Sequence, residues 1–210
     1  MGSFSFFIRQ GLSHISDITA YDHILFVVAL CALYTVREWK QILWMVTAFT
    51  VGHSIALALA VFKVVEVDTA LVEFLIPVTI IITCIYNVLQ VLKKEVAKSP
   101  SVIQTEKESN RVGMYSLILF FGVIHGVGFS NYLRFILTQE ESLTVPLLGF
   151  NLGLELGQLA IVVVALLLSY LFLEVLKITQ RLWVLIVSSI IGIMAIQLAI
   201  DTGKELYFSL

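Results

Sequence analysis

The residues with the greatest potential for chemistry in this 210-residue chain are a few ionisable side chains inside long apolar segments. They are Asp22, His23, His53, Glu73, His125 and Glu155. A charged residue at the centre of a membrane-spanning helix costs about 2.5–3.5 kcal/mol on insertion scales, so such residues usually face a partner, a cavity or a pathway. Imidazole binds zinc, copper, iron and nickel, and carboxylates extend the range to harder ions. These six residues are therefore candidate ligands of a metal ion.

The candidate ligands also share one level in the membrane. At about 1.5 Å per helical residue, they lie between about 5 Å (His23) and about 18 Å (His125) below the outer end of their segments. The inner halves offer only neutral polar groups, such as Thr47, Thr83, Tyr86 and Asn87. Segments that run in alternate directions would scatter unrelated polar residues over both halves. The shared level predicts that His23, His53, His125 and Glu155 converge on one cavity.

Several neighbouring residues would support such a site. His14 and Asp17 stand three residues apart just before the first apolar segment, where they offer further ligands or a first station for an ion. Asn151 and Gln158 share one helix face with Glu155, because the three follow i, i+4, i+7 spacing. An adjacent stripe of small residues permits close approach of another helix. It consists of Gly149, Gly153 and Gly157.

Structural roles offer alternative interpretations of the same residues. Asp22 is also explained as the carboxylate of a capping box with Thr19 at the start of a helix. His53 and His125 are each explained as a core histidine bonded to a neighbouring carbonyl. The glycine stripe is most simply a packing surface. The two histidines occur together with two glutamates, however, and this combination favours the functional interpretation.

The segments that carry these residues are predicted to be transmembrane helices of a single all-α membrane domain, residues 1–210. Hydrophobic residues make up 59% of the chain, charged residues only 13%, and the mean hydropathy is +0.98. A soluble domain carries roughly 45–50% apolar and about 25% charged residues. About 20 helical residues cross a bilayer, and only helices satisfy their backbone groups within one segment. We predict six spans, at about 20–36, 40–62, 69–92, 112–137, 145–173 and 182–200.

The first 19 residues are predicted to form a short amphipathic helix at the membrane interface, because apolar residues recur there at helical spacing. These residues are Phe4, Phe7, Ile8, Leu12, Ile15 and Ile18. Polar Asp17, Thr19 and Asp22 precede the first strongly apolar run, so we expect no cleaved signal peptide.

The distribution of basic residues predicts the orientation. Nine basic residues fall in the connections on one side, at Arg37, Lys40, Lys93, Lys94, Lys98, Lys107, Arg111, Lys177 and Arg181. Four fall on the other side, at Arg9, Lys63, Arg134 and Lys204. The positive-inside rule therefore places the polar 93–111 loop in the cytoplasm and both termini outside. We expect the chain in the inner or plasma membrane, with the candidate ligands in its outer half.

Charge, cysteines and motifs limit the function further. The net charge of −2 gives no sign of a nucleic-acid partner, so the expected partners are a metal ion and the lipid bilayer, with homo-oligomerisation left open. Cys31 and Cys84 lie inside apolar runs and are expected to be free buried thiols. The nucleophile and zinc motifs Gly-x-Ser-x-Gly and His-Glu-x-x-His do not occur in the sequence.

Four sequence motifs resemble those of the HupE/UreJ family of small membrane proteins, in the order that the family has. The first runs from Gly11 to Phe26 and contains His14, Asp17 and the Asp22-His23 pair. The others are Phe49-Thr-Val-Gly-His53-Ser54, Phe121-Gly-Val-Ile-His125-Gly126-Val-Gly-Phe129 and Gly149-Phe-Asn151-Leu-Gly-Leu-Glu155-Leu-Gly-Gln158. Together the motifs cover residues from about 11 to 160. That family is associated with supply of nickel, and sometimes cobalt, to hydrogenase and urease. The resemblance implies that the polar positions of the family's motifs correspond in this chain to His14, Asp22, His23, His53, His125 and Glu155.

These observations lead to a main hypothesis with two alternatives. The main hypothesis is a permease for nickel, cobalt or zinc, in which neutral imidazoles and ionised carboxylates replace the water shell of the ion, so that capture depends on pH. The first alternative is a metal-dependent hydrolase or transferase acting on a lipid or lipoprotein at the outer leaflet. The second is an outward-facing sensor or accessory subunit. The apolar inner half favours the alternatives modestly, because a permease needs a second half-pathway.

Overall fold

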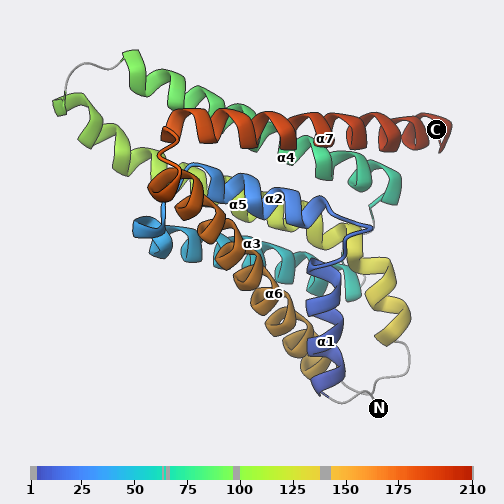
Figure 1. The fold of residues 1–210 in the computed structure, drawn as a ribbon. Helices are drawn as coiled ribbons and strands as arrows, with labels where there is room; N and C mark the ends of the chain where they lie inside the picture. Colours follow the sequence, from blue (N-terminus) through green and yellow to red (C-terminus); the bar gives the residue numbers. More distant parts are fainter. Residues whose placement is uncertain (1–3, 63, 65–66, 97–99, 138–142, 210) are drawn as a thin grey trace.

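The computed structural model describes residues 4–62, 64, 67–96, 100–137 and 143–209, and this part of the chain contains helices and no strand (Figure 1). The side chains of residues 94–96, 100–111, 130–135, 137 and 209 are not described. The elements are α1 (Phe4–Ile15), α2 (Asp22–Ala32), the 3-10 turn η1 (Val36–Glu38), α3 (Trp39–Val61), α4 (Thr69–Val96), α5 (Pro100–Leu137), α6 (Thr144–Tyr170), the π turn η2 (Leu171–Val175) and α7 (Gln180–Ser209). The predicted all-α membrane bundle is confirmed.

Five of these helices are long and apolar enough to cross a membrane. The candidate spans are Val36–Val61, Thr69–Lys93, Val112–Phe129, Thr144–Val175 and Gln180–Phe208. The segment predicted as the first span differs, because its helix α2 has only 11 residues. At about 1.5 Å per residue it reaches about 16 Å, roughly half of the hydrocarbon thickness. The described chain therefore has five full-length candidate spans and one half-length helix where six spans were predicted.

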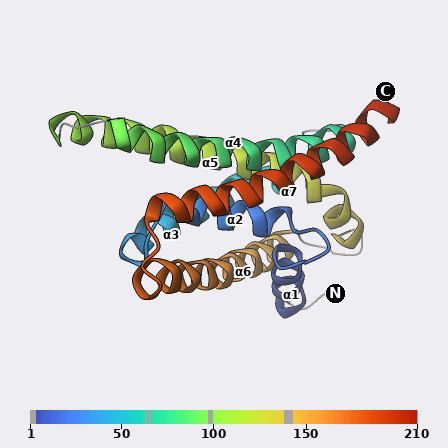
Figure 2. The same ribbon diagram turned by 45° about the horizontal axis from the view of Figure 1, so that its top comes forward.

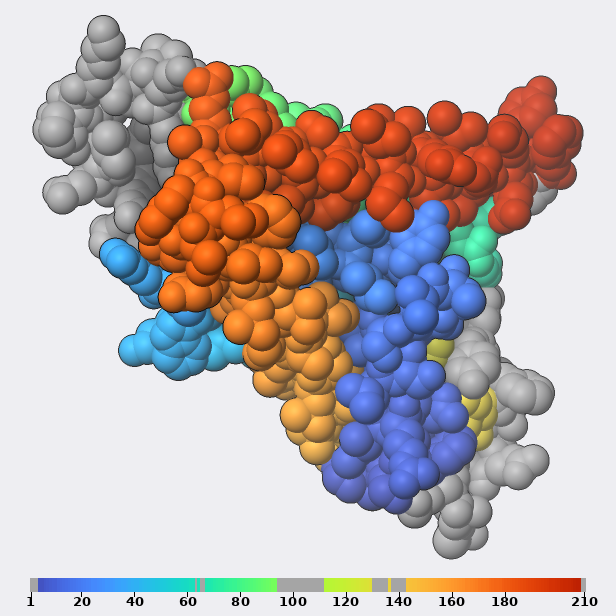
Figure 3. Space-filling view, viewed as in Figure 1, coloured from blue at the N-terminus to red at the C-terminus, as the bar shows by residue number. Residues whose placement is uncertain are grey.

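Helix α2 belongs to the core of the bundle. Eight of its 11 residues are buried, among them Phe26 and Ala29, which are fully enclosed. It contacts α3, α4, α6 and α7. Its ribbon lies between α6 and α7 (Figure 2), and in the space-filling view one side of it is visible beside α6 and below α7 (Figure 3). Irregular backbone at membrane depth is tolerated where protein buries it or where it lines a cavity. The enclosure of α2 thus explains how a helix can end inside the membrane.

Glycines bring α3 and α5 into direct backbone contact. A side chain at Gly52 would overlap the carbonyl oxygen of Leu119, and one at Gly122 would overlap that of Phe49. Small residues let membrane helices approach this closely. His53 directly follows Gly52 and His125 lies three residues after Gly122, so the contact fixes both histidines at matching depths.

The glycine stripe of α6 is a packing surface for α1. A side chain at Gly153 would overlap the carbonyl oxygen of Ile8, and one at Gly157 would overlap the side chain of Ile15. In return, Gly11 of α1 lies against the backbone of Phe150. Helix α1 is therefore docked across one end of α6 (Figure 2). Its predicted place at the membrane interface stays a prediction.

Helix α1 and the last turns of α7 lie toward the same end of the bundle, and the end of α4 and the start of α5 lie at the other (Figure 1). We call the first the α1 end. Which end faces the cytoplasm stays a prediction. The segment predicted as a polar loop, 93–111, is largely helical, since α4 continues to Val96 and α5 begins at Pro100. Residues 97–99 and residues 1–3 lie outside the described chain.

Candidate metal centre

All four histidines of the chain meet toward the α1 end of the bundle. The ring centroid of His23, in the first turn of α2, lies 4.7 Å from that of His14 in α1. It lies 5.0 Å from that of His125 in α5 and 6.0 Å from that of His53 in α3. His23, His53 and His125 are at most 3% exposed. We call these four histidines together with Asp22 the histidine cluster.

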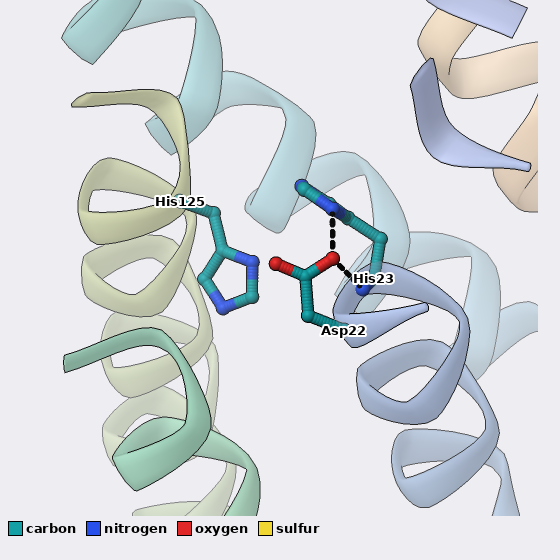
Figure 4. A group of neighbouring side chains, drawn as sticks. All are labelled: Asp22, His23 and His125. Carbon is teal, nitrogen blue, oxygen red and sulfur yellow. Dashed lines mark hydrogen bonds and ion pairs between the residues drawn. The ribbon is translucent and has the colours of Figure 1, made fainter. Parts of the chain in front are cut away.

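The tightest part of the histidine cluster is formed by Asp22, His23 and His125. One potential ligand atom from each lies within 4.8 Å of the other two. Donors at about 2.0–2.1 Å from one ion are at most about 4.2 Å apart, so small side-chain rotations would close the three groups around an ion. Figure 4 shows the Asp22 carboxylate between the two imidazoles, with one oxygen at His23 and the other turned toward His125.

Asp22 fixes the orientation of His23. Its Oδ1 atom accepts a hydrogen bond from the backbone N–H of His23 at 2.8 Å and lies 3.0 Å from the Nδ1 atom of the ring. In the neutral imidazole this contact places the proton on Nδ1 and leaves the lone pair on Nε2. Histidines that bind metals commonly donate their second ring N–H to a carboxylate in this way.

Thr79 of α4 fixes the tautomer of His125. Its Oγ1 atom lies 2.7 Å from the carbonyl oxygen of Ile76 and 3.1 Å from the Nε2 atom of His125. Because a hydroxyl has one proton, which it donates to the carbonyl, Nε2 must be the donor in the second contact. The lone pair of His125 is then on Nδ1. This hydroxyl is a second partner of the kind that orients metal-binding imidazoles.

The histidine cluster contains buried nitrogen atoms that have no hydrogen-bond partner within the described chain. They are His14 Nε2, His23 Nε2, His53 Nδ1, His53 Nε2 and His125 Nδ1. Each unsatisfied buried polar group costs about 1–3 kcal/mol. Core histidines bonded to carbonyls would not show this pattern, so the alternative interpretation of His53 as such a residue is not supported. Each neutral imidazole has one ring nitrogen with a free lone pair, and a lone pair that no protein group satisfies is available to a cation.

Aromatic rings enclose the histidine cluster. The ring of His14 lies 3.8 Å, centroid to centroid, from that of Phe129, which stacks on Phe150 at 4.9 Å. The ring centroid of Phe49 lies 5.1 Å from that of His125. This apolar wall excludes water and lowers the local dielectric constant, which strengthens the attraction between the Asp22 carboxylate and a cation.

A comparison with known protein families identifies the family of the chain. The HupE / UreJ protein family model matches residues 1–202, almost the whole chain. The chain belongs to this family. No curated protein and no solved structure matches it. The resemblance seen in the four motifs is thereby confirmed, and it extends beyond them at both ends. The HupE/UreJ family relates to nickel and cobalt handling, and the histidine cluster is a candidate site for such an ion.

The structure does not bring Glu155 of this HupE/UreJ protein to the histidine cluster. Its Oε1 atom accepts a hydrogen bond from the Oγ1 atom of Thr47 at 3.1 Å. Thr47 lies six residues before His53 on α3, about 9 Å away along the helix axis. Gln158 similarly accepts a bond from Thr50 at 2.7 Å. These two bonds tie α6 to α3. Asn151 on the same face is partly buried, and its Oδ1 atom has no hydrogen-bond partner among the residues that the structure describes.

Asp17 and Glu73 also lie apart from the tight group of ligands. Asp17 accepts bonds from the hydroxyl of Thr19 at 2.6 Å and from its backbone N–H at 2.8 Å, and these bonds lower the pKa of the carboxyl below its ordinary value. Glu73 lies on an exposed face of α4. Because Thr19 pairs with Asp17 and α2 begins without a side-chain cap, the capping-box interpretation of Asp22 is not supported.

Thr79 was not identified from the sequence. Its signal lies in the spacing of Thr79, Thr83 and Asn87, which follow i, i+4, i+8 and place three polar groups on one face of an apolar helix. Only the packing of α4 against α5 shows that this face meets His125. The aromatic wall likewise depends on which rings of three different helices come together.

We expect Thr79→Val to weaken nickel binding by about 10–100-fold, the usual cost of losing a partner that orients a metal-binding imidazole. Valine keeps the shape of threonine but cannot accept the proton of His125 Nε2. Thr83→Val is the matched control, because Thr83 lies one turn further on and donates to the backbone of Thr79 instead. Titration of both purified variants with nickel measures the effect. Equal affinities would show that Thr79 does not orient the imidazole.

Proposed function

We propose that this HupE/UreJ protein is a permease for a divalent transition metal, with nickel or cobalt as its substrate, and that the histidine cluster binds the ion in transit. The observation that carries the proposal is that every histidine in the chain, from four helices, meets around His23 and the partly buried Asp22 carboxylate beside it. Four residues placed independently for packing would have no reason to meet at one point.

The donor set of the histidine cluster supports a transition metal in particular. Neutral imidazoles favour nickel, copper, zinc and iron over magnesium and calcium, which prefer oxygen ligands. Asp22 contributes one negative charge in an apolar environment, where a bound divalent cation offsets the cost of burying the carboxylate. The family association narrows the first candidates to nickel and cobalt.

The position of the histidine cluster supports passage through the bundle. It lies among α1, α2, α3 and α5 and not on their lipid-facing surfaces, so an ion bound there is inside the protein. The half-length helix α2 begins at the histidine cluster and ends within the bundle. An interrupted helix of this kind is a common feature of transporters near their ion sites, and α2 leads from the histidine cluster into the middle of the bundle.

Transport is tested with purified protein reconstituted into lipid vesicles that contain a fluorescent metal indicator. We expect vesicles with the protein to accumulate nickel or cobalt at least about tenfold faster than protein-free vesicles, and magnesium to move no faster than in those controls. Both protein orientations should be assayed. Saturable nickel binding without movement of nickel, cobalt or zinc would contradict the permease proposal.

A metal-dependent hydrolase or transferase is the second candidate, and the donor set of the histidine cluster favours it. Three histidines with an open position are a ligand set of catalytic zinc sites, in which the metal lowers the pKa of bound water to about 7. In this case the same vesicles would bind metal without accumulating it. Zinc-dependent cleavage of a lipid ester, lost in His125→Ala, would then identify the activity.

A further inference from the structure

A cavity of about 150 Å³ lies in the half of the bundle away from the α1 end. It is lined by residues from α2, α3, α4 and α5 and from the turn after α2. Helix α2 ends at Ala32, about halfway through the membrane, and the next two residues, Leu33 and Tyr34, line the cavity. The cavity thus lies beside the end of the half-length helix.

The wall of the cavity is largely apolar. Hydrocarbon and thioether side chains from three helices form it, among them Leu30 of α2, Met45 of α3 and Phe121 of α5. No carboxylate, imidazole or basic group stands among the residues that line it. The wall therefore suits an uncharged, apolar ligand.

The polar side chains at the cavity use their hydrogen-bonding protons within the protein. The hydroxyls of Tyr34 and Tyr86 both approach the sulfur of Met114, at 3.3 and 4.0 Å. Thr83 and Asn87 donate to backbone carbonyls of α4 and α2, at 2.9 and 2.8 Å. A buried water molecule needs about two to four polar partners, so this cavity offers little to water.

The volume of the cavity fits a short hydrocarbon segment. In another protein, an engineered apolar cavity of about 150 Å³ stays dry and binds benzene. The cavity described here has the same volume, so it holds a hydrocarbon segment of about the same size. The side chains that line an empty space lose dispersion contacts, and a ligand restores them.

The cavity has a rim on the lipid-facing surface of α5. Gly113 is exposed, and a Cβ atom placed there would meet no heavy atom within 4 Å. Leu117, one turn further along the helix, is 39% exposed. Both residues line the cavity, and both lie within the candidate span Val112–Phe129. In a membrane this rim faces the hydrocarbon of the bilayer, so lipid acyl chains are the apolar ligands that reach it.

The cavity also extends in the direction of a lipid chain. Gly113 lies two residues after Arg111, where the apolar run of α5 begins, and Phe121 lies about 12 Å deeper along the helix. A phospholipid chain likewise starts at the boundary of the hydrocarbon and points toward its middle. Exposed basic residues closely flank the lining segments of α2, α3 and α4 in the chain, at Arg37, Lys40 and Lys93. Basic residues beside a span favour contact with lipid phosphates.

We propose that this cavity binds one acyl chain of a membrane phospholipid, which enters past Gly113 and Leu117 and packs against the end of α2. The chain would complete the packing of the bundle beside the half-length helix. Lipid tails are as apolar as leucine, so the chain gains little by leaving the bilayer and is held by its fit to the wall. This inference does not depend on the permease function proposed above.

Photolabelling in a membrane tests the inference. The full chain is reconstituted into vesicles of phosphatidylcholine and phosphatidylglycerol that include phosphatidylcholine with a diazirine on one acyl chain. Residues labelled on illumination are identified by mass spectrometry. Surrounding lipid should label exposed side chains such as Phe120, which is 56% exposed. A chain inside the cavity should also label Ile118 and Phe121, which line it and are only 2% and 3% exposed.

A variant that closes the cavity sharpens the test. Gly113→Phe would place a ring at the rim without overlapping the backbone. We expect it to lower the labelling of Ile118 and Phe121 by at least about tenfold, because a filled space has no room for a lipid chain. Val112→Phe is the matched control, since Val112 is 70% exposed and does not line the cavity, and it should keep the wild-type labelling. Labelling of exposed Phe120 should stay the same in both variants.

Three results would overturn the inference. The first is a wild-type label confined to exposed residues, and the second is undiminished labelling of Phe121 in Gly113→Phe. The third is labelling of the cavity by a diazirine fatty acid but not by the phospholipid, which would make a free fatty acid the occupant. If Gly113→Phe fails to fold, Leu117→Trp narrows the same rim, with the same expected loss and the same contrary result. Nickel enters none of these measurements, so the permease proposal stands or falls separately.

Discussion

Purified His125→Ala protein is expected to bind nickel or cobalt at least about a hundredfold more weakly than the wild type. The substitution removes the Nδ1 lone pair from the tight group formed with Asp22 and His23. Losing a direct ligand should lower the metal affinity by more than the 10–100-fold expected when a residue that only orients a ligand, such as Thr79, is replaced. His23→Ala should have an effect of the same size, because it also leaves the Asp22 carboxylate without its ring partner. Titration calorimetry or the visible spectrum of bound cobalt measures both affinities, and vesicle uptake should fall in parallel.

Glu155→Gln is the informative control for these variants. It also alters an ionisable side chain within an apolar helix, but its hydrogen bond to Thr47 can be kept by the amide oxygen. We therefore expect nickel affinity within about twofold of the wild type. If Glu155→Gln lost binding as completely as His125→Ala, the motif-based ligand set would be correct and the assignment from the geometry would not. If neither histidine variant lost binding, the histidine cluster would not be the metal site.

The positions of the helices followed from the sequence wherever hydropathy alone decides them. Five apolar runs of sufficient length became five candidate spans, because a membrane leaves helices as the only way to satisfy the backbone. The end of α2 was not predicted, since the apolar run continues through Leu33 and Tyr34 without a glycine or proline. A local signal was nevertheless present. Thr35 and Glu38 form a capping box at the start of the 3-10 turn η1, which leads into α3, and the Glu38 carboxylate lies 3.1 Å from the backbone nitrogen of Thr35.

The sequence predicted only some of the residues that meet at the site, and the reason is physical. Depth along a helix can be counted from the sequence, so the shared level of His23, His53 and His125 was visible. The rotation of a helix about its axis depends on its neighbours, and the sequence does not fix it. Glu155 illustrates the difference, because it turns toward Thr47 and away from the imidazoles. Pairings such as Thr79 with His125 join residues far apart in the chain and depend on the packing of α4 against α5.

Substitution of a glycine at the contact between α1 and α6 should lower the stability of the fold. Gly153→Val would press a side chain into the backbone carbonyl of Ile8, which cannot move aside as a flexible side chain can. Overpacking of this kind costs about 1–3 kcal/mol and displaces one of the two elements. In a chain of this size that loss corresponds to a fall of roughly 2–12 °C in Tm. Gly113→Val is the matched control, because a Cβ atom there meets no heavy atom within 4 Å, and its Tm should stay near that of the wild type.

Metal binding by the Gly153→Val variant tests whether α1 belongs to the site. His14 reaches the ring of His23 from α1, so displacement of α1 would withdraw one imidazole and leave Asp22, His23 and His125 in place. We therefore expect nickel affinity to fall by less than in His125→Ala and by about as much as in His14→Ala. If Gly153→Val lowered the Tm while binding stayed at the wild-type level, His14 would line the histidine cluster without serving the ion. If both the Tm and the affinity were unchanged, α1 would have to sit at the membrane surface without docking on α6, because the observed contact leaves no room for a valine side chain.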